Sequence, residues 1–362
     1  MLGTRGIPAS HGGFETFAQK LAEHLADQNW EVTVYCQEEG SGPITESVWK
    51  NIHLVKVPEP RLDAIGTMRF DWRCIKHASK TNELVLTLGY NTAMFDFWLK
   101  LKKIPHVMNM DGLEWKRSKW GIPARAWFYI NEWAGSIIAN HLIADHPVIL
   151  SRFSNRRAPN AISMIPYGAD RILSASDSPI KKFDLKPKSY VICIARPEPE
   201  NSLLDIVSVF SKEPRGHQLV VLSNLKPEIN AYHAKVVSAA GPEVVLLGAI
   251  YDKKIVQALR FHSKLYIHGH TVGGTNPSLV ESLGTGSPVL AHDNIFNRWV
   301  AGAAAQFFDS PKSLDLQLKE LLSNNNLLDE MATSSIKRFE DDFAWEKILN
   351  RYEILLSKYC EI

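Results

Sequence analysis

The sequence of 362 residues has little cysteine, no long apolar run and almost no excess charge. Its cysteines are far apart and form no CxxC pair, so we expect reduced thiols and predict neither a disulfide framework nor a zinc site. They are Cys36, Cys74, Cys193 and Cys360. No apolar run reaches the ~18 residues of a membrane-spanning helix, and no signal-peptide pattern is found. We therefore expect a cytoplasmic protein, or one bound peripherally at a membrane.

Charge and motifs exclude further classes. The 41 basic and 39 acidic residues give a net charge of +2, which argues against a dedicated nucleic-acid binder. The chain has no Asp-x-Asp pair, which argues against a metal-chelating, single-domain glycosyltransferase, and we expect no metal. His268 and His270 would suit a metal pair, but histidines that line a pocket at a strand end are an equal alternative.

Strand patterns alternate with helical patterns along the chain, which predicts an α/β fold with parallel sheets covered by helices on both faces. The strand patterns cover residues 31–36, 53–57, 84–88, 106–110, 190–195, 218–222, 244–247, 265–268 and 288–291. A turn-rich stretch after residue 168 separates two halves. We predict domains at 1–168 and 169–343 and a C-terminal amphipathic helix in 344–362, with the ligand at the carboxyl ends of the strands, in the crevice between the halves.

The N-terminus lacks an expected element. A glycine loop, residues 3–13, begins after only two residues, although such a loop normally follows a buried strand. The first strand is therefore predicted to be missing or truncated. Loss of a central strand would remove several kcal/mol of stability, so we expect poor folding or impaired activity.

Residues 268–291 carry the most informative pattern, a strand end followed by a glycine turn and a helix start. The glycines allow close approach of a ligand, the cap residues can donate to a bound oxygen, and the helix start attracts anions. A carboxylate one turn into the helix would accept from two sugar hydroxyls. This favours a nucleotide-sugar site over a structural turn with a capped helix. The predicted binding residues are Gly273, Gly274, Thr275, Asn276 and Glu281.

A second glycine pair and an arginine extend the predicted donor site. Gly12 and Gly13 begin a helix and would form a wall beside the donor phosphates, the alternative being a flexible turn. Arg196 follows a strand, and its guanidinium would hold a diphosphate through paired hydrogen bonds. The alternative is a surface arginine balanced by Glu198 and Glu200.

Two carboxylates follow the strand at residues 106–110. Asp111 and Glu114 would orient or deprotonate an acceptor hydroxyl, and with Arg196 they form the predicted catalytic set. The alternative for Asp111 is a helix cap.

Residues 115–133 combine aromatic and basic side chains. Such a mixture suits the headgroup region of an anionic bilayer, while a helix that packs its aromatics in a core is an equal alternative. The residues are Trp115, Lys116, Arg117, Lys119, Trp120, Arg125, Trp127 and Trp133.

Taken together, these segments resemble a known family, the retaining GT-B glycosyltransferases of family four, and more closely the bacterial rhamnosyltransferase-like branch of capsule and O-antigen assembly. The segments that carry the resemblance are residues 3–16, 111–117, 165–169, 196–201 and 268–281. The resemblance implies two Rossmann-like domains facing a central cleft, the first on the acceptor side and the second binding the donor. It also implies that the C-terminal helix crosses back to the first domain.

The resemblance further implies substrates and mechanism. The donor would be a nucleotide-sugar, dTDP-rhamnose first, with no cofactor. The acceptor would be an undecaprenyl-diphosphate-linked saccharide at the inner face of the cytoplasmic membrane. The glycosidic bond would form with retention, the leaving phosphate taking the acceptor proton. Glu281 would bind the ribose and Arg196 the diphosphate. The wider family differs in having a lysine near residues 200–201 and a glutamate at Gly273.

We therefore predict a metal-independent hexosyltransferase of the EC 2.4 class in surface polysaccharide synthesis. Two alternatives stay open. One is a nucleotide-sugar epimerase of the same two-lobed fold. The other is a catalytically inactive glycosyltransferase-like subunit, indicated by the short N-terminus and by Gly273 in place of glutamate.

Overall fold

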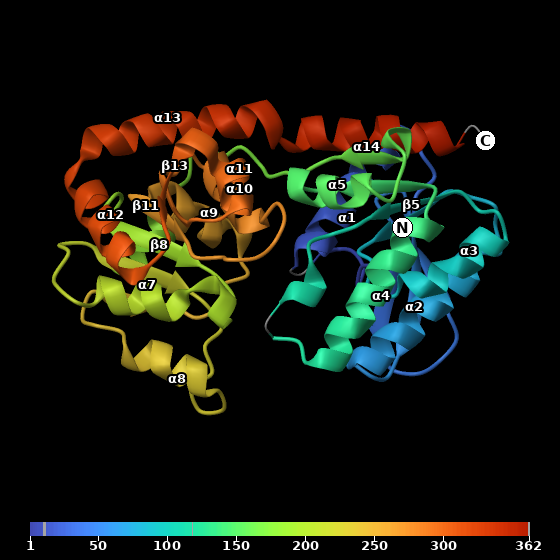
Figure 1. Ribbon diagram of the computed structural model, residues 1–362, viewed down its shortest axis with the longest axis horizontal. Helices are drawn as coiled ribbons and strands as arrows, with labels where there is room; N and C mark the ends of the chain where they lie inside the picture. The colour runs from blue at the N-terminus through green and yellow to red at the C-terminus, as the bar shows by residue number, and fades with distance from the viewer. Residues whose placement is uncertain (10–11, 118, 361–362) are drawn as a thin grey trace. The chain divides into compact units, whose positions relative to one another are not determined.

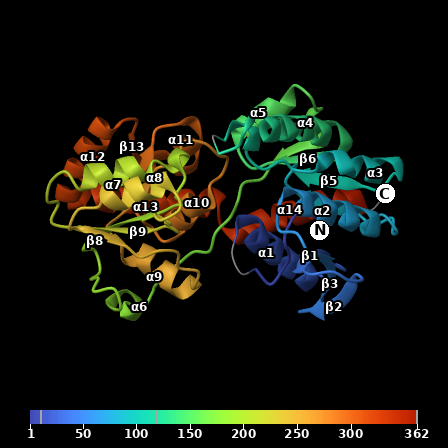
Figure 2. The same cartoon turned by 90° about the horizontal axis from the view of Figure 1, so that it is seen from below.

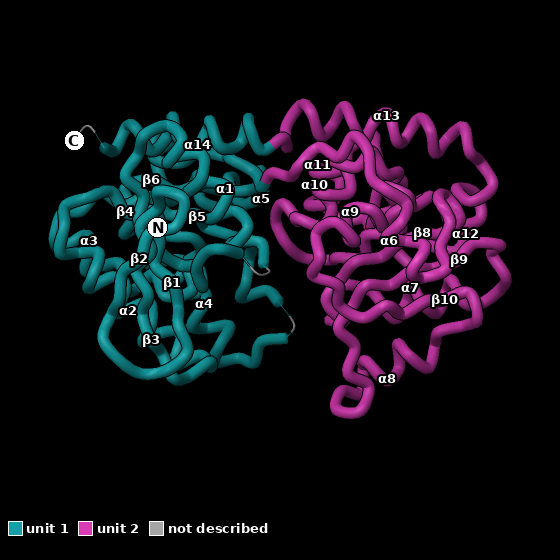
Figure 3. Tube along the Cα trace, turned by 180° about the vertical axis from the view of Figure 1, so that it is seen from behind, with its two compact units in different colours: residues 1–167, 345–362 teal, residues 168–344 magenta. Residues whose placement is uncertain are grey.

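The computed structural model describes residues 1–9, 12–117 and 119–360 (Figure 1). Ser10, His11 and Ser118, which belong to the sequence motifs above, lie outside the described residues. The chain divides into two compact units, coloured separately in Figure 3. Unit 1 comprises Met1–Tyr167 with Trp345–Ile362, and unit 2 comprises Gly168–Ala344. These junctions lie one residue from the predicted boundaries at 168 and 343.

The strands of unit 1 form two groups. The first has the order β1 (Thr33–Glu39), β3 (Ile52–Glu59), β2 (Thr45–Trp49), and the second has the order β4 (Val85–Leu88), β5 (His106–Asn109), β6 (His141–Ala144), β7 (Ile162–Met164). All neighbours pair in parallel except β2, which is antiparallel to β3. The sequence patterns did not predict β2, whose side chains are mostly exposed so that no buried face marks it, or the short strands β6 and β7.

Met1 and Leu2 join the two groups of strands. Leu2 forms a parallel bridge with Thr87 of β4, and its N–H donates to the Leu86 carbonyl at 2.8 Å. On the other side, the Tyr35 N–H of β1 donates to the Met1 carbonyl at 3.2 Å. The position predicted for a missing strand therefore holds these two residues, and Leu2 is 3 % exposed.

Helices cover both faces of the unit 1 sheet, as the strand alternation requires. Val34 and Cys36 of β1 pack with one set of helices, whereas Tyr35 between them packs with the other. The first set is α1 (Gly13–Asp27) and α14 (Trp345–Cys360), and the second includes α2 (Ala64–Ala78) and α3 (Phe97–Leu101). The remaining unit 1 helices are η1 (Ala93–Asp96), η2 (Glu114–Lys116), α4 (Ile122–Ile138), α5 (Pro147–Ser154) and η3 (Pro159–Ala161).

Unit 2 contains a parallel sheet with the order β10 (Val244–Leu246), β9 (Gln218–Leu222), β8 (Tyr190–Ile194), β11 (Leu265–His268), β12 (Val289–His292), β13 (Ala305–Phe308). Ile192 of β8 packs with α9 (Lys253–His262), α10 (Pro277–Gly284) and α13 (Asn325–Asp342). Val191 and Cys193 face α7 (Leu203–Phe210), α8 (Ala231–Ser238) and α12 (Pro311–Ser323). The other helices are α6 (Ser178–Lys181), η4 (Pro199–Asn201), α11 (Ile295–Ala301) and η5 (Gly302–Ala304).

The C-terminal helix α14 belongs to unit 1, where it lies against α1 (Figure 2). The Tyr352 ring is 4.8 Å from the Phe17 ring, centroid to centroid. Its hydroxyl accepts a hydrogen bond from the Asn109 Nδ2 of β5 at 2.7 Å. Both partners are buried, so this bond ties the C-terminal helix to β5, an inner strand of the second group. Within the described residues, no helix is both long and apolar enough to cross a bilayer.

We predict that Tyr352→Phe lowers the free energy of unfolding of unit 1 by about 1–2 kcal/mol, because it leaves the buried Asn109 amide without its acceptor. Urea denaturation measures the change. Tyr129→Phe, on a ring that is 41 % exposed, is the control and should cost less than about 0.5 kcal/mol. Equal losses in both variants would show that the Asn109–Tyr352 bond contributes nothing specific.

Candidate functional site

The loops after β8 and β11 are bonded to each other in unit 2. The Thr271 N–H donates to the Glu200 carbonyl at 2.9 Å, and the Ser278 hydroxyl reaches the Ile194 carbonyl at 3.4 Å. A side chain at Gly269 would lie 2.3 Å from the Asn201 carbonyl, so only glycine permits this approach. The predicted segments 196–201 and 268–281 therefore meet at the carboxyl edge of one sheet.

The start of α10 has the geometry of an anion-binding turn. Asn276 is the N-cap, and its side-chain oxygen accepts from the Ser278 N–H at 3.0 Å. Pro277 takes the first helical position, where a proline loses no hydrogen bond. Gly273, by contrast, has no neighbouring atom within 4 Å of the position that a side chain would take. Space for a ligand thus remains beside the helix start.

The Glu281 carboxylate is held by a residue that the sequence interpretation missed. Arg260 of α9 is 3 % exposed, and its Nη2 lies 2.7 Å from Glu281 Oε2. The same guanidinium donates to the carbonyl and the hydroxyl of Ser278 and to the Ser282 hydroxyl. Arg260 therefore fixes both the carboxylate and the first turn of α10, while 43 % of the Glu281 side chain stays exposed. The sequence offered one signal: Arg260 follows Val256 by four residues and Leu259 by one, which predicts that it lies on or beside the apolar face of a helix.

Arg196 projects from the loop after β8. Its carbonyl accepts from the Asn201 side chain at 2.8 Å, which shapes the loop. Among the described residues, the exposed Arg196 guanidinium makes no ion pair, and none joins it to Glu198 or Glu200. Arg196 is therefore exposed without being paired to the two glutamates, and its charge is available to a ligand.

His268 and His270 stack on each other rather than opening toward a common ligand. Their rings are parallel to within 9° at 4.2 Å between centroids. Burial, together with the neighbouring His270 and Arg260, holds the pKa of His268 well below its usual value, so the ring is neutral. In the described part of the chain no group of three or more His, Cys, Asp or Glu side chains is placed to hold a metal ion.

The predicted phosphate wall in unit 1 is less open than expected. Gly12 is the N-cap of α1, with φ of 102°, and Gly13 is its first residue. The Glu15 carboxylate lies so close that a side chain at Gly12 would collide with it, and it also accepts from the Arg5 N–H at 3.2 Å. A negative charge therefore already occupies this helix start, which disfavours a phosphate there.

The pKa values of the two predicted carboxylates of unit 1 are shifted in opposite directions. Burial, with the charges of Glu114 and Asp145, raises the pKa of Asp111 to about 7, which suits proton transfer near neutral pH. Asp111 follows β5 with φ of 50° and caps neither η2, which begins after Leu113, nor α4, which begins after Gly121. The helix-cap alternative is therefore wrong.

Glu114 is bound within the unit. Its carboxylate accepts from Arg117 at 2.8 Å and from the Trp120 indole at 3.1 Å. Burial alone would raise the pKa of Glu114, but Arg117, Trp120 and Lys119 outweigh it and lower the pKa. The carboxylate stays ionised and paired, so it is a weaker candidate for proton transfer than Asp111.

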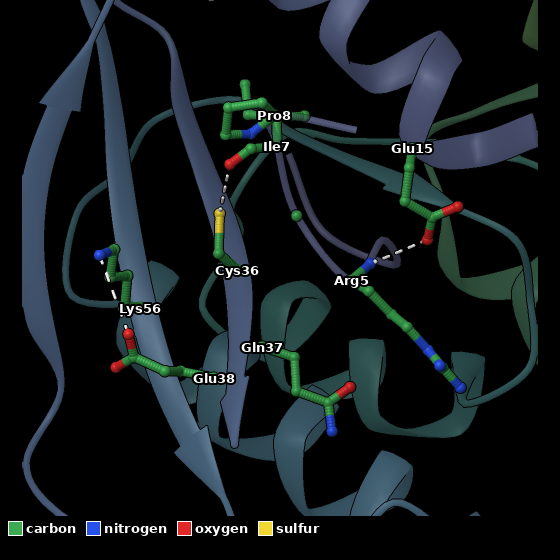
Figure 4. Close-up of a pocket in the computed structure, with 9 residues that line it drawn as sticks. Arg5, Ile7, Pro8, Glu15, Cys36, Gln37, Glu38 and Lys56 are labelled. Atoms are coloured by element: carbon green, nitrogen blue, oxygen red, sulfur yellow. Dashed lines mark hydrogen bonds and ion pairs between the residues drawn. The ribbon is translucent and has the colours of Figure 1, made fainter. Parts of the chain in front are cut away.

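A hollow of 440 Å³ with a mixed polar and apolar lining lies beside the N-terminal glycine loop (Figure 4). Its charged lining comes from the loop, from α1 and from the ends of β1 and β3. Lys56 pairs with Glu38 at 3.8 Å, and the Cys36 thiol points to the Ile7 carbonyl at 3.8 Å. The lining residues are Arg5, Gly6, Ile7, Pro8, Glu15, Cys36, Gln37, Glu38 and Lys56.

Three of the four tryptophans in residues 115–133 are partly buried and donate hydrogen bonds within unit 1. The indole N–H groups of Trp115, Trp120 and Trp127 donate to Glu132, Glu114 and the Asn91 carbonyl, at 2.7, 3.1 and 2.8 Å. Trp133 is 40 % exposed. The aromatic stretch is thus divided between internal packing and surface.

Comparison with known proteins gives the fold. Residues 1–170 match the family described as "Domain of unknown function (DUF1972)". No curated protein matches the sequence. Among solved structures, the chain is similar to sucrose-phosphate synthase from Thermosynechococcus elongatus, with 14 % identity over 96 % of this chain and 93 % of that one and a TM-score of 0.79.

Two further solved structures cover nearly all of the chain. HepE from Anabaena, in complex with UDP and glucose, has 14 % identity over 97 % of this chain and 98 % of that one, with a TM-score of 0.76. The UDP-forming α,α-trehalose-phosphate synthase from Burkholderia xenovorans has 9 % identity, covers 98 % and 99 %, and has a TM-score of 0.74. The chain therefore has the predicted GT-B fold of two Rossmann-like α/β domains.

We predict that Asp111→Asn raises stability above pH 7. The folded-state pKa of about 7 exceeds the unfolded value of about 4, so the contribution of Asp111 to stability is greatest below pH 4 and is lost as pH rises through 7. The pKa difference of about 3 corresponds to at most about 4 kcal/mol. Asparagine tolerates the positive φ of residue 111, so the backbone should not change.

Unfolding curves recorded from pH 4 to pH 8 measure this difference between wild type and variant. Asp184→Asn is the control, since Asp184 has φ of 55° but is exposed. A wild-type pH profile retained in Asp111→Asn would show that Asp111 is not the titrating group.

Proposed function

We propose that the protein transfers a hexose from a nucleotide-sugar to a saccharide acceptor. The observation that carries the proposal is the edge of the unit 2 sheet, where the capped start of α10, the fixed Glu281 carboxylate and the loop with the exposed Arg196 meet. One positive group, one set of helix-start N–H groups and one hydroxyl acceptor match the diphosphate and ribose of such a donor.

The chemistry follows from these residues. Arg196 and the N–H groups at the start of α10 stabilise the charge that develops on the departing diphosphate, so the residues need no metal for this task. Glu281, positioned by Arg260, accepts from the ribose hydroxyls. The resemblance to family four favours retention, with the leaving phosphate taking the acceptor proton.

The donor is proposed in two steps. HepE, which shares the fold, is known in complex with UDP-glucose, and this supports a nucleotide-sugar as the substrate class. The motif at residues 268–281, which resembles the rhamnosyltransferase-like branch, favours dTDP-rhamnose as the sugar donor.

The acceptor is proposed to be a lipid-linked saccharide, met at the inner face of the cytoplasmic membrane during capsule or O-antigen assembly. In unit 1, Asp111 has the pKa of a group that can exchange a proton with an acceptor hydroxyl. The hollow beside Arg5 carries charged and amide side chains that suit a hydroxyl-rich ligand. Its cysteine thiol and proline ring also give it apolar surface.

A direct assay tests the proposal. Purified protein is incubated with radiolabelled dTDP-rhamnose or UDP-glucose and an undecaprenyl-diphosphate saccharide, and the products are separated into glycolipid and sugar nucleotide. Labelled glycolipid supports transfer. An altered sugar nucleotide would support the epimerase alternative, and donor binding without turnover would support the inactive subunit.

We predict that Arg196→Ala and Glu281→Ala each weaken nucleotide-sugar binding by roughly 10- to 100-fold, the value of a charge-assisted hydrogen bond of about 1.5–3 kcal/mol. Titration calorimetry measures the affinity for whichever nucleotide-sugar, dTDP-rhamnose or UDP-glucose, the wild type uses in the assay above. Lys337→Ala and Glu330→Ala remove exposed charges on α13 of unit 2 and are the matched controls. Unchanged affinity in both site variants would refute the assignment.

We also predict that Arg260→Lys weakens nucleotide-sugar binding about tenfold by releasing Glu281, because a lysine keeps the charge but loses the fork that binds Glu281, Ser278 and Ser282 together. The double variant Arg260→Lys/Glu281→Gln should then bind little worse than Glu281→Gln. Fully additive losses would mean that Arg260 acts independently of Glu281.

A further inference from the structure

Helix α4 buries several polar side chains and exposes most of its large apolar ones. The side toward the unit 1 core carries Asn131, Glu132 and Ser136, all fully buried. The solvent-facing side carries large apolar side chains at positions i, i+7, i+8, i+11 and i+15, which lie along one helical face. They are Ile122 (83 %), Tyr129 (41 %), Ile130 (52 %), Trp133 (40 %) and Ile137 (56 %).

The buried polar groups hold the helix in this orientation. Glu132 accepts from Arg152, Arg156 and the Trp115 indole, at 2.7–3.0 Å. Asn131 accepts from the Met94 N–H at 2.9 Å. Rotating α4 to bury its isoleucines would leave these groups without partners, at a large cost in free energy. The apolar face must therefore stay outside.

The exposed face continues onto the neighbouring helices. The Lys100 ammonium at the end of α3 donates to the Ile137 carbonyl at 3.0 Å, which places the two helix ends together. Gly135 of α4 lies against Ala93 of η1. These neighbours expose Met94 (43 %), Phe97 (52 %) and Leu101 (60 %). We call these residues, with those of α4, the α3–α4 face.

The exposed charges on the segments that form the α3–α4 face share one sign. In the described part of residues 97–140, each exposed charged residue is basic, whereas Asp111, Glu114 and Glu132 are partly or fully buried. The exposed cations are Lys100, Lys102, Lys103, Lys116, Lys119 and Arg125. Exposed basic residues on the same segments as exposed isoleucine, tryptophan and tyrosine are complementary to an anionic surface with an apolar interior.

We propose that the α3–α4 face docks on an anionic lipid bilayer. Tryptophan and tyrosine favour the headgroup boundary, isoleucine and phenylalanine the acyl region, and lysine the anionic headgroups. The proposal rests on the proposed function, because a protein docked on the bilayer would meet the lipid-linked acceptor there. It differs from the sequence-based expectation, because Trp115, Trp120 and Trp127 donate to internal acceptors and contribute little.

Vesicle sedimentation tests the proposal. The full chain should bind vesicles of phosphatidylglycerol mixed with phosphatidylcholine and bind poorly to phosphatidylcholine alone. Ile130→Glu/Ile137→Glu should weaken binding by at least about tenfold, since two apolar anchors are lost. Lys100→Gln/Lys103→Gln should weaken it by about fivefold per charge, and added salt should weaken it further.

Matched controls separate the face from general surface hydrophobicity. Ile354→Glu/Leu316→Glu changes two side chains that are 63 % and 57 % exposed on α14 and α12. This variant should sediment with vesicles like the wild type. Equal loss in the control, equal binding to neutral vesicles or no binding to anionic vesicles would each overturn the proposal.

Two measurements keep the test independent of folding and of catalysis. Brominated lipids should quench wild-type fluorescence more than that of Trp133→Phe, which leaves all charges in place. Nucleotide-sugar binding without lipid reports on the proposed function separately. If sedimentation velocity without lipid shows a dimer that Ile130→Glu/Ile137→Glu dissociates, and vesicles do not bind, the face holds a second copy and the lipid proposal is wrong.

Discussion

Parallel strands that are covered by helices on both faces carry apolar side chains. Polar and charged side chains can therefore lie together only beyond the ends of these strands. In unit 2, Tyr190, Val191, Ile192 and Cys193 are all fully buried, and polar residues follow only where β8 and β11 stop. The same holds for Asp111 after β5 in unit 1. The candidate groups on each unit are therefore consequences of how each sheet is covered by helices.

The buried guanidinium of Arg260 connects this scaffold to the candidate site. A charge with so little exposure is stable only if its donors are satisfied, and here carbonyl, hydroxyl and carboxylate acceptors satisfy them. Because those acceptors belong to α10, the same contacts that make the charge tolerable also orient Glu281. Stability and positioning are thus two effects of one network.

In unit 1, buried polar contacts likewise determine which side of a helix faces solvent. Glu132 and Asn131 give α4 a polar interior contact, and the apolar residues of that helix consequently lie at the surface. A periodicity-based interpretation assigns apolar residues to the core and would place α4 the other way round. The partners of Glu132, namely Arg152, Arg156 and Trp115, together with the bond of Asn131 to Met94, explain the orientation.

The amino-acid sequence by itself determined the alternating α/β fold, most strands and the capped turn at residues 273–278, because these depend on local pattern and on residue chemistry. It did not reveal β2, the bridge of Leu2 to Thr87 or the Arg260 contact. The Leu2 bridge and the Arg260 contact join residues far apart in the chain, whereas β2 lacks a buried face that would mark it in the sequence. Tertiary structure alone decided that Glu15 fills the first helix start, that Glu114 is paired and that Asp111 is enclosed, since burial and neighbouring charges arise only on folding.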